Sequence, residues 1–147
     1  MEIVTLKELN IRLKALQHKI DNASATLPTL GNIAQNTIEE SFDNQASPFK
    51  EKWIPNKPST LRFKKGNKTL IDSGALCVSF TQRITGKSVQ IGTNKQYARI
   101  HNFGGKAGRN KKVNIPQRPF IPVKQNGEVA KDFAQKIENF LKKYILS

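Results

Sequence analysis

The sequence predicts an α+β domain with two N-terminal helices, a small antiparallel sheet built on a hairpin, and a C-terminal helix packed on that sheet. Two patterns predict this class. Apolar residues recur at helical spacing toward both ends of the chain, whereas apolar and polar residues alternate between residues 76 and 91. The chain has 147 residues, 37% of them hydrophobic, which is typical of one globular domain and not of a disordered chain.

The expected domain, 1–147, divides into four parts with different residue patterns. They are a helical N-terminal part at 1–43, a long basic loop at 44–69, strands with a basic loop at 70–123, and a C-terminal helix at 128–146. A loop as long as the second part is unusual in a compact domain unless it is functional or mobile.

The first helix is predicted by its start signal and by its apolar spacing. Thr5 and Glu8 have the spacing of a capping box, in which each side chain accepts a backbone N–H from the other residue. The apolar residues that follow alternate at spacings of three and four, which makes a stripe as narrow as a coiled-coil seam. We expect this stripe to pack on its own domain, with contact to a second subunit as the alternative. Its members are Leu6, Leu9, Leu13, Leu16 and Ile20.

A second helix is expected from Pro28, because proline suits the first turn of a helix. The residues after Phe42 contain three prolines, which predicts a loop from 43 to 59. Trp53 in this loop is interpreted as a cap over the hydrophobic core. The apolar face of the second helix is expected to consist of Leu30, Ile33, Ala34, Ile38 and Phe42.

The middle of the chain predicts a hairpin. Residues 76–85 alternate between apolar and polar, Gly86 and Lys87 supply a turn, and the alternation continues to Gly92. The segment from Tyr97 to Phe103 fits either a short helix or an extended strand. Residues 104–112 are expected to form a loop, and residues 113–123 an extended edge interrupted by three prolines.

The last helix is expected from about Glu128 to Ile145, with Asn126 as its cap. Its apolar residues recur at helical spacing and predict one buried face. That face consists of Val129, Phe133, Ile137, Phe140, Leu141, Tyr144 and Ile145.

The positive charge is concentrated in one part of the chain. The formal net charge is +14, and no Asp or Glu occurs from Ser73 to Gly127, where ten Lys and Arg residues lie. Such a region attracts nucleic-acid phosphates or an acidic protein, although a solubilising bias without any partner explains the charge equally well. Any DNA contact would be to the backbone and independent of sequence. The candidate contacts for phosphate or an acidic partner are Lys106, Arg109, Lys111 and Lys112.

The sequence argues against an enzyme. His101 is the best candidate for a general base, but the nearest acids in sequence are Asp72 and Glu128, so it lacks a local carboxylate partner. The alternative is a histidine that orders its loop through local hydrogen bonds. Cys77 and two distant histidines do not have the spacing of a zinc site, and no P-loop occurs. We therefore expect no catalytic residue, no metal and no cofactor.

The chain begins without a signal-peptide pattern, contains no apolar run of transmembrane length, and has one cysteine. We expect no membrane partner. We expect the protein to stay in a cytoplasm or to be packed into a particle that assembles there.

Four segments together resemble the phage virion morphogenesis family, the tail-completion proteins of Mu-like phages and prophages. The first is Ser41-Phe42 followed by Ser47-Pro48 and Trp53, and the second runs from Leu70 to Leu76. The third runs from Val89 to Gly104, and the fourth is the Ile115-Pro-Gln-Arg-Pro-Phe120 stretch. The residues that carry the resemblance are Trp53, Gly74, Leu76, Gly92, Tyr97, Ala98, His101, Phe103, Gly104, Pro116, Arg118, Pro119 and Phe120.

The resemblance implies a structural protein of tail completion and head–tail joining, which forms a homo-oligomeric ring such as a hexamer at the head-proximal end of the tail. Its implied partners are other copies of itself, the tail tube and the head connector. Its implied place is the virion, or the host cytoplasm during assembly. Pro116 and Pro119 would stiffen an extended stretch, Arg118 would fork to a carboxylate, and Phe120 would anchor the core or an interface. The alternative function is sequence-independent nucleic-acid binding.

Overall fold

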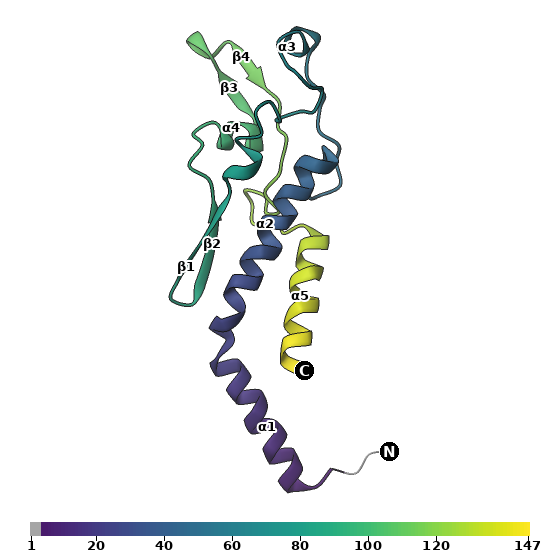
Figure 1. Ribbon diagram of the computed structural model, residues 1–147, viewed down its shortest axis with the longest axis vertical. Helices are drawn as coiled ribbons and strands as arrows, with labels where there is room; N and C mark the ends of the chain where they lie inside the picture. Colours follow the sequence, from purple (N-terminus) through teal and green to yellow (C-terminus); the bar gives the residue numbers. More distant parts are fainter. Residues whose placement is uncertain (1–3) are drawn as a thin grey trace.

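The computed structural model describes residues 4–147, so the first three residues of the expected helical part lie outside it. Figure 1 shows an elongated molecule in which helix α2 runs through the middle, with helix α5 on one side and the β1–β2 hairpin on the other. Helix α1 continues away from the body beyond the N-terminal end of α2. Helix α3 and the β3–β4 hairpin lie at the opposite end.

The order of elements confirms the α+β class. The helices are α1 (Leu6–Asp21), α2 (Leu27–Asn44), α3 (Pro58–Leu61), α4 (Ala98–Phe103) and α5 (Lys131–Leu146). The strands form two antiparallel hairpins, β1 (Thr81–Thr85) with β2 (Ser88–Gly92), and β3 (Gly105–Ala107) with β4 (Val113–Ile115). Short 3₁₀ turns are η1 (Ala23–Thr26), η2 (Cys77–Ser79) and η3 (Arg109–Lys111).

Helix α1 begins with the predicted capping box. The Glu8 amide donates to Thr5 Oγ1 at 3.2 Å, and the Thr5 amide donates to Glu8 Oε2 at 2.8 Å. The helix contains no buried residue, and its stripe is open to solvent, with Leu6 86% exposed and Leu13 56% exposed. The expectation that this stripe packs on its own domain is therefore wrong. The reason is that α1 projects from the body and meets it only near its C-terminal end (Figure 1).

Helix α2 begins at Leu27 with proline in its first turn and ends at Asn44, and the following Gln45, with a φ of 53°, turns the chain out of the helix. Its inward face carries the core residues Ile38 and Phe42. The predicted second helix is confirmed.

The core is a cluster of aromatic rings around Phe42. The ring of Phe42 lies 5.3 Å from Trp53, 5.3 Å from Phe120 and 6.4 Å from Phe80, measured between centroids. These rings come from α2, the loop after it, the residue between η2 and β1, and the last motif segment, so the cluster joins parts that are distant in sequence. Burying aromatic rings of this size is a principal source of stability in a small domain.

The β1–β2 hairpin is confirmed, with Gly86 and Lys87 at its turn and Thr85 paired with Ser88. The first half of the predicted strand is wrong, because residues 77–79 form the 3₁₀ turn η2. Leu76 and Phe80 are both buried while Val78 is 78% exposed. An apolar pair four residues apart suits a helical turn as well as a strand, and here the turn places both side chains in the core.

The expected loop at 104–112 is wrong, because it contains strand β3 and returns as a second hairpin with β4. Gly105 pairs with Ile115 and Ala107 with Val113. Gly108 at the tip has a φ of +78°, and a Cβ there would lie 3.2 Å from Val113 Cγ2. Glycine therefore permits both the turn and the close approach of Val113.

The last helix begins at Lys131, later than expected, and Asn126 does not cap it. Asn126 Oδ1 instead accepts the Glu128 amide at 2.9 Å in the turn that precedes the helix. Helix α5 packs on α2 and α1 and not on the sheet, because α2 lies between them (Figure 1). Lys136 pairs with Glu40 at 3.0 Å, and Tyr144 Oη donates to the Lys19 carbonyl at 3.3 Å. The predicted face is only half-buried, and Val129 and Ile145 are exposed.

Within residues 4–147, no helix combines the length and the apolar character that crossing a membrane requires.

Candidate functional site

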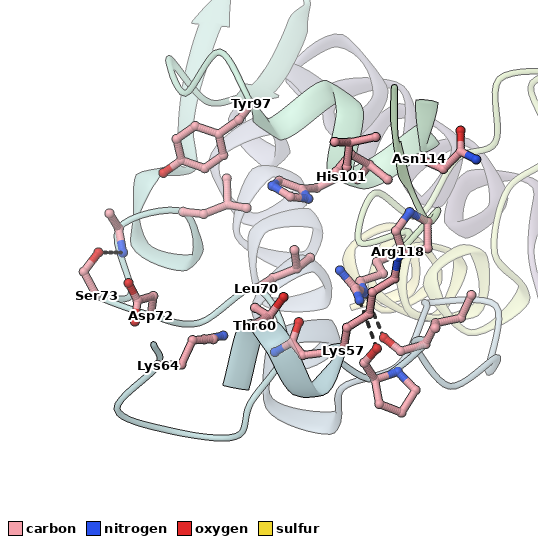
Figure 2. A pocket seen from close by; sticks show the side chains of 18 of the residues that line it. Lys57, Thr60, Lys64, Leu70, Asp72, Ser73, Tyr97, His101, Asn114 and Arg118 are labelled. Carbon is pink, nitrogen blue, oxygen red and sulfur yellow. Dashed lines mark hydrogen bonds between the residues drawn. The ribbon is translucent and has the colours of Figure 1, made fainter. Parts of the chain in front are cut away.

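Three of the four segments that carry the family resemblance meet at one cavity of about 580 Å³. The cavity lies between α4, the chain after β4, the turn before η2, and the loop that contains α3. Figure 2 shows Tyr97 and His101 on one side and Lys57, Thr60 and Lys64 on the facing side. The motif residues that line it are Gly74, Leu76, Tyr97, His101, Pro116 and Arg118.

Local structure explains how these side chains arrive at the cavity. Tyr97 and His101 are one helical turn apart at α4, and their rings meet edge to face with centroids 5.9 Å apart. Gly74 has a φ of +80°, a left-handed conformation that favours glycine and turns the chain into η2. Pro116 directly follows β4 and restrains the extended chain that leads to Arg118.

Arg118 fastens the floor of the cavity to the long loop. It is 7% exposed, its Nε donates to the Ile54 carbonyl at 2.9 Å, and its Nη2 donates to the Pro55 carbonyl at 3.3 Å. Its backbone amide donates to the His101 carbonyl at 2.9 Å. The expected fork to a carboxylate is replaced by these carbonyl contacts. Burial lowers the pKa of the Arg118 guanidinium below its ordinary value.

His101 sits in the cavity wall beside that cation. Its Nδ1 atom is buried, and no residue among 4–147 provides it with a hydrogen-bond partner. Burial, and then the charge of Arg118, lower the pKa of His101, so the neutral imidazole is favoured. Asp72 lines the same cavity, although it is distant from His101 in sequence. No hydrogen bond or ion pair joins Asp72 to His101 in the described chain, so the pair is not arranged as an acid–base couple.

Several motif residues lie outside the cavity. They belong to the hydrophobic core, bridge neighbouring segments, or line a separate groove. Trp53 is buried, and its Nε1 donates to the Pro119 carbonyl at 2.8 Å. Gly104, with a φ of +72°, lies so close to the Gln117 amide that a Cβ would be 3.0 Å from that nitrogen. Phe120 and Ala98 belong to the core, whereas Gly92 and Phe103 line a separate apolar groove.

Asn102 is the residue that sequence reasoning missed. It is 2% exposed, and its Oδ1 accepts the amides of Phe120 and Ile121, both at 3.0 Å. The sequence offered only a weak signal, the position of Asn102 between Ile100 and Phe103, because the burial that obliges an asparagine to satisfy its amide group is decided by the fold.

The candidate phosphate contacts lie apart from the cavity, on the β3–β4 hairpin. This hairpin stands at the end of the molecule that lies opposite α1 (Figure 1). Asn110 and Lys111 at its tip have φ values of 57° and 53°. The side chains of Lys106, Arg109, Lys111 and Lys112 are all exposed there, so one short element presents four positive charges to solvent.

Residues 4–147 contain no cluster of side chains suited to binding a metal ion. Within the part of the chain that the structure describes, no three His, Cys, Asp or Glu side chains are grouped closely enough to hold an ion. Burial raises the pKa of the Cys77 thiol, with further increases from Asp43 and Glu39, so this half-buried cysteine is not an activated nucleophile.

Comparison with known proteins supplies a family. Residues 4–145 match the model of the phage virion morphogenesis family. The chain is 28% identical over 140 residues to "Mu-like prophage FluMu G protein 2" of Haemophilus influenzae. The aligned residues cover 95% of this chain and 94% of that protein. It is 30% identical over 122 residues to an uncharacterized protein of Methanocaldococcus jannaschii, covering 76% of this chain and 86% of that protein. No solved structure matches the chain significantly.

Proposed function

The chain belongs to the phage virion morphogenesis family, and from this premise we propose that it is a structural subunit that completes the tail and joins it to the head. In this role it forms a homo-oligomeric ring at the head-proximal end of the tail and performs no catalysis. Its partners are its own copies, the tail tube and the head connector. It acts during assembly in the host cell or within the virion.

The observation that carries the proposal is the family match across 4–145, together with the relative whose name assigns it to a Mu-like prophage. The hydrogen bonds of two motif residues and of Asn102 support a structural role. Arg118, Trp53 and Asn102 each use their polar atoms to tie separate segments together. Their side chains are occupied in holding the fold and are not free to act on a substrate.

Deletion of the gene from an inducible phage that encodes this chain tests the role directly. We expect full heads and complete-looking tails to accumulate separately, as seen by electron microscopy, with infectious titre restored by a plasmid copy. Joined, infectious virions in the deletion strain would contradict the proposal. Replacing the candidate general base, His101→Gln, should leave the titre of a complemented strain unchanged if the protein is not an enzyme.

The oligomeric state tests the ring. Light-scattering mass after size exclusion at several protein concentrations should give a discrete oligomer, because closed symmetric assemblies have a defined number of subunits. A broad, concentration-driven increase without a limiting mass would contradict a closed ring.

A second candidate function is sequence-independent nucleic-acid binding, favoured by the exposed basic side chains of the β3–β4 hairpin. Replacing all four by alanine should weaken binding to a mixed-sequence duplex. Each lost phosphate contact reduces the slope of log affinity against log salt by about 0.9, so the slope should fall by up to about 3 to 4. The variant is Lys106→Ala, Arg109→Ala, Lys111→Ala and Lys112→Ala.

The matched control removes the same charge from exposed lysines on the helices. It should retain a steeper salt slope than the hairpin variant if the hairpin is the contact, and equal slopes would show only a general charge effect. The control is Lys7→Ala, Lys14→Ala, Lys131→Ala and Lys143→Ala.

A further inference from the structure

The cavity of about 580 Å³ contains two buried polar atoms that the protein itself does not satisfy. Three buried side-chain atoms in residues 4–147 lack a hydrogen-bond partner, and two of them, Asn56 Nδ2 and His101 Nδ1, belong to residues that line this cavity. The third, Gln82 Oε1, lies on strand β1. A buried polar group without a partner costs free energy, so two such groups at one cavity point to a ligand that satisfies them.

Most of the remaining wall of the cavity is apolar. Three large side chains that line it stay open to solvent, with Ile54 56% exposed, Val113 50% exposed and Tyr97 44% exposed. An apolar cavity with a few polar groups is the common form of a ligand site, and the volume lies within the usual range of ~300 to 1,000 Å³. The cavity can therefore accept an apolar side chain. Its other apolar wall residues include Leu70, Ala75, Leu76, Ile115 and Pro116.

The rim of the cavity is basic. Lys57 and Lys64 border it on the side of α3 (Figure 2). Strand β4, which also lines the cavity, belongs to the hairpin that presents four exposed positive charges. Asp72 is the only acid between Glu51 and Glu128, a stretch that contains every residue lining the cavity. The resulting positive potential favours an anionic ligand. Further exposed basic residues follow α3 at Arg62, Lys65 and Lys68.

We propose that this cavity binds an acidic peptide segment of another protein, with an apolar side chain in the cavity and carboxylates at Asn56, His101 and the basic rim. The inference deepens the proposed function and rests on it for the kind of partner, which is another protein of the assembling virion. The Asn56 amide can donate to a carboxylate oxygen, and the His101 ring can donate from one nitrogen. Hydrogen bonds to an ionised carboxylate are stronger than those between neutral groups.

An acidic peptide fits this cavity better than a nucleic acid does. A phosphodiester backbone has the required charge, but it carries no aliphatic side chain to fill the apolar walls. Bases bind by stacking on aromatic faces. Tyr97 and His101 supply the only aromatic rings that line the cavity, and these two rings already meet edge to face.

A different protein is the partner because a second copy of this chain offers no suitable segment. Each copy carries a net charge of +14, so copies repel one another. The densest acidic stretch of the chain, 39–43, is part of helix α2, and Glu40 in it is paired with Lys136. Asp132 and Glu138 on α5 also form ion pairs with lysines.

The first test measures peptide binding by fluorescence polarisation at low salt. Two pools of short labelled peptides are built from aspartate and glutamate around one central residue, which is leucine in one pool and serine in the other. The leucine pool should bind about tenfold or more tightly, because a leucine side chain gains affinity when it leaves water. Equal affinity for the two pools, or no binding of the leucine pool, would overturn the proposal.

The second test blocks the cavity. Thr60 is exposed on α3 and borders the cavity, so Thr60→Trp should weaken binding of the leucine pool by about tenfold or more (Figure 2). The matched control is Ser59→Trp, at the neighbouring exposed position of α3, which does not line the cavity. The control should keep the wild-type affinity, and equal affinities of the two variants would count against this site.

The third test removes one of the unsatisfied groups. Asn56→Leu keeps the size of the side chain and eliminates a buried donor that has no partner, so the Tm of the free protein should not fall. Affinity for the leucine pool should nevertheless decrease by about tenfold, the effect expected when a hydrogen bond to a charged group is lost. Unchanged affinity would show that Asn56 does not contact the peptide and would contradict the proposed arrangement.

The outcomes separate this inference from the proposed function and from nucleic-acid binding. A mixed-sequence duplex that binds more tightly than the leucine pool, and that loses affinity in Thr60→Trp, would overturn the peptide in favour of phosphate. Failure of the leucine pool to bind overturns this inference alone, because the deletion phenotype tests head–tail joining without it. Joined, infectious virions in the deletion strain contradict the proposed function even where the pool binds.

Discussion

Asn102 and Phe120 are both almost completely buried, and Asn102 Oδ1 accepts the backbone amide of Phe120 at 3.0 Å. The same oxygen accepts the Ile121 amide at 3.0 Å. One side chain on α4 therefore satisfies two backbone donors of the chain that leads from β4 to α5. This clamp keeps the Phe120 ring against Phe42 in the core.

Replacing Asn102 with leucine should destabilise the protein by about 2 to 4 kcal/mol. The substitution keeps the size of the side chain and leaves two buried N–H donors without an acceptor, each of which costs ~1 to 3 kcal/mol. The free energy of unfolding can be measured by urea denaturation with the fluorescence of Trp53, the only tryptophan in the chain.

Asn36→Leu, at an exposed position of α2, is the control for the change of residue type. It should alter the free energy of unfolding by less than about 0.5 kcal/mol. A similar loss in both variants would mean that the clamp at Asn102 contributes little.

Replacing Arg118 with lysine should loosen the long loop. An ammonium group cannot reproduce the planar guanidinium that donates to the carbonyls of both Ile54 and Pro55. We expect a loss of about 1 to 3 kcal/mol in the free energy of unfolding. Hydrogen exchange should also accelerate at the amides of Thr60 and Leu61, which donate to the Lys57 carbonyl in the same loop. Arg83→Lys on the exposed face of β1 should leave their exchange unchanged.

Replacing Gly104 with alanine should destabilise the protein by about 1 to 3 kcal/mol. Its φ of +72° is unfavourable for alanine, and the new Cβ would lie 3.0 Å from the Gln117 nitrogen and 3.1 Å from the Ile115 oxygen. Gly66→Ala, where a Cβ meets no atom within 4 Å, is the matched control for thermal denaturation. Equal Tm values for the two variants would contradict a tight approach at Gly104.

The free energy of unfolding should decrease as the pH is lowered below 6.5, because His101 titrates differently in the folded and unfolded chains. Burial and the charge of Arg118 lower the pKa of His101 below 6.5, so the unfolded chain binds a proton more readily than the folded one. The contribution of His101 is therefore fully present above pH 6.5 and is lost as the pH falls toward the lowered pKa.

His101→Gln should flatten the decline in the free energy of unfolding below pH 6.5, as measured by urea denaturation across a pH series. His18→Gln replaces the other histidine, at an exposed site, and serves as the matched control. An identical pH profile for wild type and His101→Gln would show that His101 does not contribute to this decline.

Local patterns in the sequence determined the starts of the first two helices and the first hairpin, but not the start of the last helix. The Thr5–Glu8 capping box, Pro28 at the start of α2, and Gly86 in the turn each act through neighbouring residues, so no knowledge of the fold is needed to interpret them. The family resemblance also came from the sequence, because it depends on the order and spacing of the motif segments.

Only the tertiary structure decided how these parts combine. The spacing of Leu76 and Phe80 is compatible with a strand or a helical turn, and the shape of the core selected the turn. The residues that the side chains of Asn102 and Arg118 bond to lie 18 or more residues away in sequence, and α2 separates α5 from the β1–β2 hairpin. An apolar stripe shows that α1 must be covered, but which surface covers it depends on contacts between distant parts of the chain, or between chains, that no local pattern contains.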